Sequence, residues 1–240
     1  MPVERYLAGF SRRDWLVETC DEAGVTLMTA YRLQTEPAVR RTREADRDGP
    51  IGEAVQAHAH FSNRILDHGG AGQWRLDPGL AGGGAIMNLG IDPLNTIRFL
   101  LDEDPDSVLA TTATQHEAFE GVEEHAAFQL VFPSGMTASC TTSFHAHQAS
   151  SLHLLGTEGR IRIEAPFGGY VPHDIHVEWG DVEMQYTDPV VDEVIEEFDY
   201  FANHVQTDRQ PEPDGEDGVR DLEVIGAIYE AAERRTQVSL

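Results

Sequence analysis

The sequence of 240 residues predicts an α+β fold, with a large and mostly antiparallel open sheet flanked by helices. Ahead of this sheet it predicts the last helix–strand unit of a truncated doubly wound domain. Two observations support this fold class. The chain opens with a helical pattern, a glycine and an apolar run, which is the order of elements in an α/β unit. Further on, apolar-rich segments are separated by three-residue turns, and connections this short join antiparallel strands.

The opening unit occupies residues 1–32. Residues 11–23 have apolar side chains at helical spacing, Ser11 is a suitable N-cap, and Gly24 ends the helix. Residues 25–31, VTLMTAY, form a short apolar run that is typical of a strand buried on both faces. We therefore expect this unit to be the end of a doubly wound domain whose first strands are absent.

The sheet and its helices follow. Residues 36–48 predict an arginine-rich helix with Pro37 in its first turn, and residues 54–61 alternate like a half-exposed strand. Residues 190–204 and 217–235 have amphipathic helical patterns, and the second helix is expected to pack back on the opening unit. Further strands are predicted at residues 107–115, 125–132, 136–146, 151–156 and 160–165.

The charge balance is extreme: 42 Asp and Glu against 17 Arg, with no Lys, give a formal net charge of −25. Such a field repels nucleic acid and anionic membranes, so neither is an expected partner. No apolar stretch approaches the length of a membrane span. The abundant carboxylates and the missing lysine predict a cytoplasmic protein of a halophile, and the two widely spaced cysteines fit a reducing compartment.

The most informative motif is AGGGAIMNLGIDPLNTIRFLL, residues 81–101. A dinucleotide fingerprint needs G-x-G-x-x-G directly after a buried strand, and residues 82–84 have neither that spacing nor that strand. These glycines instead suit a tight turn that lets a helix approach another backbone. The helix would bury one apolar face, formed by Ile86, Leu89, Pro93, Ile97 and Leu100.

Asn88 and Asp92 suggest a chemical function for the same helix. They are four residues apart, so both side chains are expected on one face of an α-helix. An amide and a carboxylate placed there could hold a hydroxyl group and accept its proton. Spacing alone leaves both the catalytic and the purely structural interpretation open.

Several stretches together resemble the Gfo/Idh/MocA family of oxidoreductases, which includes sugar dehydrogenases of halophilic archaea. They are GQWRLDPGLAGGGAIMNLGIDPLNTIRFLLDEDP, AGVTLMTAYRLQTEP, GPIGE, LLGTEGRIRIEAP and DLEVIGAIYEAAE. The resemblance implies that residues 1–32 are a remnant of a dinucleotide-binding Rossmann domain. It implies that residues 33–240 are the family's C-terminal substrate and oligomerisation domain. The implied cofactor is NADP or NAD, the implied substrate is a sugar, and a homo-oligomer is expected through the open sheet.

The resemblance also implies roles for single residues. Trp74 and Arg75 match a Trp-Arg pair that contacts the cofactor in the family, and Tyr170 matches a cofactor-contacting tyrosine. Tyr31 and Arg32 match a Tyr-Arg pair that lines the substrate cleft. Without the resemblance, Trp74 would be interpreted as a packing aromatic and Arg75 as a surface cation.

Asn88 and Asp92 match the two catalytic helix positions, where the family usually has Asp and then Tyr or His. The second position lies beside the C1 hydroxyl of the sugar. The family also has a Glu-Lys-Pro motif whose lysine assists proton removal, and the matching Arg5 stays protonated in proteins. An unperturbed aspartate, with a pKa of ~3.9, is a weak base at neutral pH, so Asp92 would need burial to raise this pKa.

Two functions follow from these residues. The first is NAD(P)-linked oxidation of an aldose at C1, and the second is a catalytically degenerate family member that serves as a binding or oligomerisation module. A metal site is a further alternative. His58 and His60, and likewise His145 and His147, place two imidazoles on one face of a strand. The family uses no metal, so we expect none here.

Overall fold

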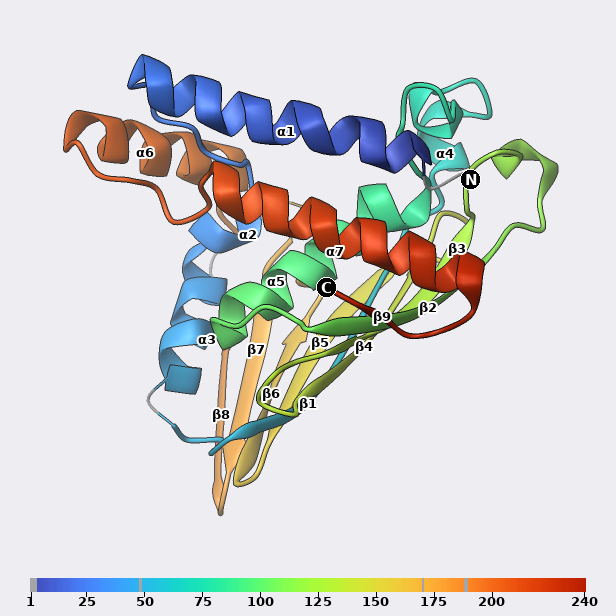
Figure 1. Cartoon of the computed structure of the whole chain (residues 1–240). Coiled ribbons are helices and arrows are strands. Elements are labelled where there is room, and N and C mark those ends of the chain that lie inside the picture. The colour runs from blue at the N-terminus through green and yellow to red at the C-terminus, as the bar shows by residue number, and fades with distance from the viewer. Residues whose placement is uncertain (1–3, 48, 170, 188–189) are drawn as a thin grey trace.

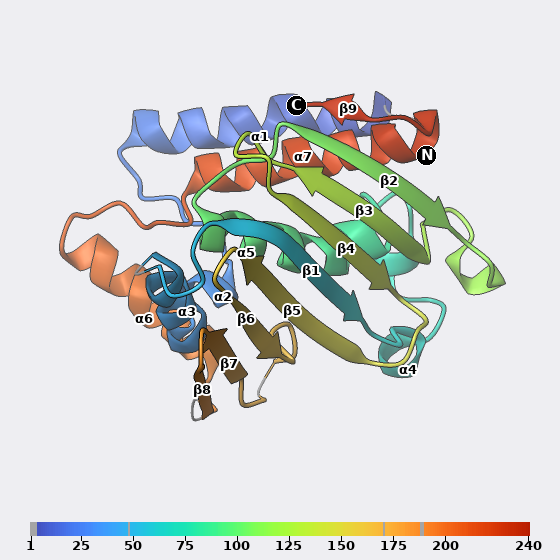
Figure 2. The ribbon, with the colours of Figure 1, turned by 90° about the horizontal axis from the view of Figure 1, so that it is seen from below.

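A nine-stranded sheet forms one layer of the protein, and helices form a second layer on one of its faces (Figure 1). The structure, a computed structural model, describes residues 4–47, 49–169, 171–187 and 190–240. Figure 2 looks onto the other face, where no described helix covers the central strands. The fold class predicted from the sequence is confirmed.

The strands of the sheet lie in the order β8-β7-β6-β5-β1-β4-β3-β2-β9. β1 and β4 are parallel, and the other neighbouring strands in the described part of the chain are antiparallel. The strands predicted from the sequence after residue 33 are confirmed. The full set is β1 Ala54–Ser62, β2 Ser107–Ala113, β3 His125–Val131, β4 Thr137–Ser143, β5 Ala149–Gly156, β6 Gly159–Glu164, β7 Asp174–Trp179, β8 Val182–Thr187 and β9 Val238–Ser239.

The helical layer has α5 next to the sheet and α1 outermost, lying along α7 (Figure 1). This confirms that the last helix packs back on the opening unit. Among the described residues, no helix has the length and apolar character needed to cross a membrane. The helices are α1 Glu4–Ala23, α2 Arg32–Thr35, α3 Pro37–Arg47, α4 Leu66–Gly69, α5 Ile91–Leu101, α6 Glu193–Gln206 and α7 Gly215–Arg234. A π-helical turn, Ile86–Gly90, precedes α5, and short 3-10 turns lie at Trp74–Leu76 and Glu117–Phe119.

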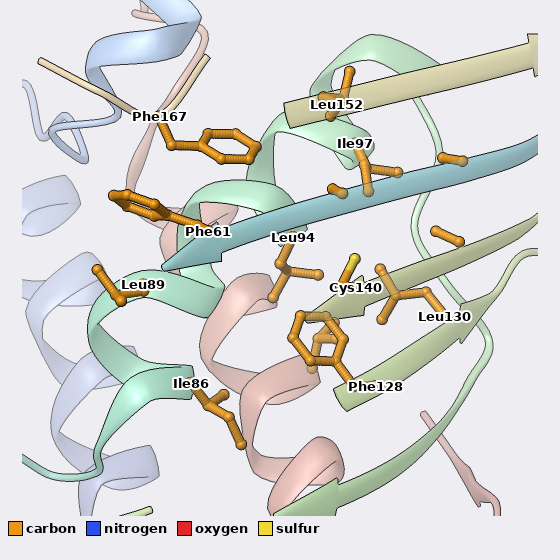
Figure 3. Packing of buried hydrophobic residues seen from close by; sticks show 14 of the residues in the cluster. Phe61, Ile86, Leu89, Leu94, Ile97, Phe128, Leu130, Cys140, Leu152 and Phe167 are labelled. Carbon is orange, nitrogen blue, oxygen red and sulfur yellow. The ribbon is translucent and has the colours of Figure 1, made fainter. Parts of the chain in front are cut away.

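The core lies between α5 and the covered face of the sheet. Alternation along the strands turns side chains such as Phe128 and Cys140 toward α5, while Leu94 and Ile97 point down from the helix (Figure 3). All four are buried, as is the apolar helix face predicted from the sequence. This packing fixes the position of α5, and with it the position of Asp92.

Residues 25–31 are not the buried strand that the sequence predicts. Val25 is 58% exposed, and the segment forms only an isolated bridge between Met28 and Asp214. An extended segment becomes a strand only when a neighbour supplies hydrogen bonds along its length, and the described residues supply a single bridge. The apolar pattern was therefore not enough to identify this element.

Two further differences concern element ends and missed strands. Helix α1 begins at Glu4, well before the Ser11 cap predicted from the sequence. The hairpin of β7 and β8 was not predicted. The β7 segment alternates polar and apolar residues, with Ile175 and Val177 buried, so this alternation is a signal that could have found it.

Candidate active site

Glu123 caps the helix start that follows the glycines. Its carboxylate accepts the backbone N–H groups of Gly84 and Ile86, each at 2.9 Å, and the Tyr229 hydroxyl at 2.7 Å. Burial raises the pKa of Glu123, although these hydrogen bonds act in the opposite direction. A protein carboxylate thus occupies the helix N-terminus where a phosphate would otherwise bind.

The glycines allow this close packing. Gly82 has a φ of +74°, which a residue with a side chain rarely adopts. A Cβ on Gly84 would lie 2.2 Å from the backbone carbonyl oxygen of Glu123. The interpretation as a tight turn and a close backbone approach is therefore confirmed, and the nearby backbone is that of Glu123.

A π-helical turn changes the relation between Asn88 and Asp92. The turn covers Ile86–Gly90 and contains Asn88, whereas Asp92 lies in the α-helix that follows. The expected common face assumed a regular α-helix, and a π-helical turn contains more residues per turn. Asp92 lines a cavity beside α5, whereas the half-buried Asn88 is not among the described residues that line it.

This cavity of about 60 Å³ brings three predicted site residues together: Tyr31, Arg32 and Asp92. Ala30, Leu33, Asn95 and Thr96 complete its described lining. Burial raises the pKa of Asp92 from 3.8 to about 6, against the effect of Arg32 and with a smaller contribution from Glu193. The carboxylate is therefore much closer to the proton affinity required of a base at neutral pH.

Arg32 is held beside Asp92 by contacts with two other elements. It forms an ion pair with Glu193 at the start of α6 and donates to the backbone carbonyl of Phe167 at 2.8 Å. Burial alone would raise the pKa of Glu193, but His173 and Arg32 outweigh it and lower this pKa. Glu193 therefore stays ionised and holds the guanidinium in place.

Tyr31 belongs to a buried polar network below the cavity. Its hydroxyl is hydrogen-bonded to Asp221, and burial together with this carboxylate raises the tyrosine pKa. Asp221 accepts from Asn95 at 2.7 Å and pairs with Arg98. Gln34 donates to Asn95 at 2.9 Å. The network ties α2, α5 and α7 together and fixes the helix that carries Asp92.

The predicted cofactor residues lie in other places. Trp74 and Arg75 are in the 3-10 turn between α4 and the glycines, with the guanidinium carbon 4.6 Å from the indole ring centre. Trp74 is 53% exposed, so it is not a core residue. Neither residue is part of the described lining of the Asp92 cavity. Tyr170 lies outside the described residues, and its role stays a prediction.

The predicted histidine pairs make contacts other than metal coordination. His60 Nδ1 and Ser151 Oγ are 2.9 Å apart, and His145 Nδ1 is 2.6 Å from Glu124. Burial would raise the pKa of Glu124, but backbone hydrogen bonds and nearby histidines lower it to about 2. In the described part of the chain, no three His, Cys, Asp or Glu side chains are grouped to hold a metal ion.

Comparison with known protein families shows which family the chain belongs to. The sequence profile of the GFO/IDH/MocA C-terminal domain matches residues 39–162. The chain belongs to this family. Its match includes β1, the glycine stretch and α5, so the helix that carries Asp92 lies within the family domain.

Individual family members agree over most of the chain. The D-xylose 1-dehydrogenase [NADP(+)] of Haloarcula marismortui is 43% identical over 235 residues, which cover 97% of this chain and 65% of the relative. D-xylose 1-dehydrogenase (NADP(+)) 2 of Haloferax volcanii is 32% identical over 92% of this chain and 66% of its own length. The chain therefore spans slightly less than two thirds of these relatives.

A solved structure of the family agrees with the fold. The crystal structure of aldose–aldose oxidoreductase from Caulobacter crescentus, complexed with glycerol, matches with a TM-score of 0.89 at 30% identity. The match covers 96% of this chain and 69% of that protein.

Four residues of the site were not identified from the sequence: Asn95, Thr96, Glu123 and Glu193. Asn95 and Thr96 follow Asp92 at helical spacing, so this spacing is a signal that could have found them. Glu123 and Glu193 lie far along the chain from the groups they contact. Nothing in the local sequence marks them, because tertiary folding brings them to the site.

Proposed function

We propose that this chain provides the substrate-binding part of an NADP-dependent sugar dehydrogenase. In this proposal, Asp92 accepts the proton of the C1 hydroxyl group when an aldose is oxidised. The observation that carries this proposal is the half-buried Asp92 in the cavity beside Arg32, where desolvation raises the pKa of its carboxyl group to about 6, which suits a base at neutral pH. Family membership supports the reaction class, and the names of the haloarchaeal relatives support D-xylose and NADP.

Arg32 and Asn88 would assist in different ways. The Arg32 guanidinium, fixed by Glu193, stabilises the carboxylate form of Asp92 that accepts the proton. Asn88 is half-buried in the π-helical turn before Asp92, and its amide remains our predicted second contact for the sugar. Arg5, which matches the family's lysine, stays protonated, so we assign proton removal to Asp92 in this proposal.

Two described residues, Trp74 and Arg75, suit the binding of one part of a nicotinamide cofactor. The exposed indole of Trp74 and the Arg75 guanidinium offer a flat apolar surface and a positive charge, which suit a nucleotide. The helix start at Gly84 is already occupied by Glu123, so the phosphates would need other residues. When bound, NADP supplies the acceptor for the C1 hydride.

The experiment is turnover of D-xylose with NADP at high salt, followed by NADPH absorbance. We expect kcat/KM to fall below about pH 6, because Asp92 must be ionised. Asp92→Asn should lower kcat by roughly 10²–10⁴-fold, the range for loss of a general base. Asp181→Asn, on the exposed β7–β8 turn, is the control and should leave kcat unchanged.

Two results would contradict this proposal. One is full activity of Asp92→Asn. The other is a chain that binds sugar but shows no oxidation at any pH, which would favour the alternative of a binding or oligomerisation module.

We call the face of the sheet whose central strands no described helix covers the bare face (Figure 2). We propose that it pairs with a second copy of the chain. None of β1 to β5 contains Asp, Glu or Arg, although the chain has a net charge of −25. Charged residues are depleted at the centres of protein interfaces, so these strands suit the centre of an interface.

A further inference from the structure

A buried threonine with an unpaired hydroxyl lines the cavity beside Asp92. Thr96 lies four residues after Asp92 on α5, lines the same cavity and is 1% exposed. Among the described residues, its Oγ1 has no hydrogen-bond partner. A helical threonine can donate to the carbonyl of the preceding turn, and that bond is not made here. Buried polar atoms rarely remain unpaired, so this hydroxyl points to a ligand.

The other polar side chains of the lining are already engaged. Tyr31 is hydrogen-bonded to Asp221, and Asn95 donates to the same carboxylate. Arg32 is held by Glu193 and by a backbone carbonyl. Among the described lining side chains, the Thr96 hydroxyl and the Asp92 carboxylate make no hydrogen bond to other described residues, so they are the donor and the acceptor that we assign to an occupant.

The volume and the pair of polar groups together define the occupant. A cavity of about 60 Å³ has room for one or two waters, or for one carbon that carries a hydroxyl, and is too small for a sugar ring. An O–H group can accept from Thr96 and donate to Asp92 at the same time. We infer that Thr96 and Asp92 form a binding site for one hydroxyl group, which belongs to a polyol or sugar or to a water in its place.

The consequence for catalysis rests on the proposed function. If Asp92 accepts the proton of a sugar hydroxyl, Thr96 donates to the oxygen that loses it. Such a bond strengthens as negative charge develops on this oxygen, so Thr96 would stabilise the transition state as well as orient the substrate. It would also select sugars that have a hydroxyl at this position.

Crystals of the full chain grown without polyols, and the same crystals soaked in D-xylose, test the site directly. We expect an oxygen within hydrogen-bond distance of Thr96 Oγ1, from water in the first crystal and from the sugar in the second. Thr96→Val should lose this oxygen, and Thr96→Ser should keep it. The inference is overturned if both wild-type crystals lack the oxygen and the Thr96 hydroxyl donates to the Asp92 carbonyl.

Dissociation constants for D-xylose, measured by calorimetry, show whether the hydroxyl group at Thr96 belongs to the sugar or to a water. Thr96→Val should weaken binding about tenfold, while Thr96→Ser stays near wild type. Thr35→Val is the matched control, because the buried Thr35 hydroxyl donates to the Arg32 carbonyl at 2.9 Å. Equal affinity of Thr96→Val and wild type would overturn the sugar contact and leave water as the occupant. A wild-type chain that binds no D-xylose would contradict the proposed function, and the polyol-free crystal would still decide the hydroxyl site.

Discussion

Asp92 lies near an arginine and a glutamate that act on its pKa in opposite directions. Arg32 lowers this pKa, whereas Glu193 and burial raise it, and burial is the largest effect. Burial therefore outweighs Arg32, and Glu193, which pairs with Arg32, offsets a further part of its effect. Without Glu193, Arg32 would lower the pKa of Asp92 further and make it a weaker base.

Replacing Asp92 by asparagine should stabilise the protein at neutral and higher pH. The pKa of Asp92 is higher in the fold than its ordinary value of 3.8, so its contribution to stability is complete below that value and is lost as pH rises through about 6. At about pH 8 we expect Asp92→Asn to gain on the order of 2 kcal/mol in the free energy of unfolding. Urea titrations of both proteins check this.

The gain of Asp92→Asn should disappear below about pH 4, where the wild-type carboxyl is also neutral. Asp181→Asn, at an exposed turn, should show no comparable gain at either pH. Lower stability of Asp92→Asn at high pH would contradict the buried, pKa-shifted state of Asp92.

The start of the π-helical turn before α5 depends on a residue that is distant in sequence. Glu123 accepts two backbone N–H groups at this helix start, and the missing side chain of Gly84 lets its backbone approach. Helix ends need such partners because their first N–H groups have none within the helix. The same glycines that resemble a phosphate loop thus serve to dock a helix against the strand connection that carries Glu123.

Gly84→Ala should therefore destabilise the protein by about 3 kcal/mol or more, because the new Cβ would lie 2.2 Å from a backbone oxygen. Gly72→Ala is the control, since a Cβ there meets nothing within 4 Å. We expect this control to change stability by less than about 1 kcal/mol. Thermal unfolding of the two variants compares them, and equal stability would contradict the close approach at Gly84.

At the scale of the whole molecule, charge is divided unevenly over the sheet. β1 to β5 contain no Asp, Glu or Arg, whereas β6, β7 and β8 all contain acidic residues. In a chain of net charge −25, this leaves the central bare face as the place where two copies could approach with least repulsion. A halophilic habit stays a prediction from the acidic composition.

Thr141→Arg tests the proposed pairing of two sheets. Thr141 is exposed on the bare face of β4, and an arginine there would bury an unpaired charge in a dimer. We expect at least a roughly tenfold weaker dimer in sedimentation analysis. Gln185→Arg, on exposed β8 at the edge of the same face, should leave the dimer intact. A wild-type chain that stays monomeric at all concentrations would contradict the proposal.

The sequence by itself determined the α+β class, the strands with clear alternation, and the helix that presents Asp92. These features depend on periodicity and on short turns, which are local. The strand expected at residues 25–31 was wrong because pairing requires a neighbour. The β7–β8 hairpin was missed although β7 alternates polar and apolar residues. Only the tertiary structure decided that Glu123 caps the π-helical turn before α5, that Glu193 fixes Arg32, and that Thr96 shares a cavity with Asp92. Burial and contacts between distant segments set proton affinity and hydrogen bonding, and neither can be calculated from spacing along the chain.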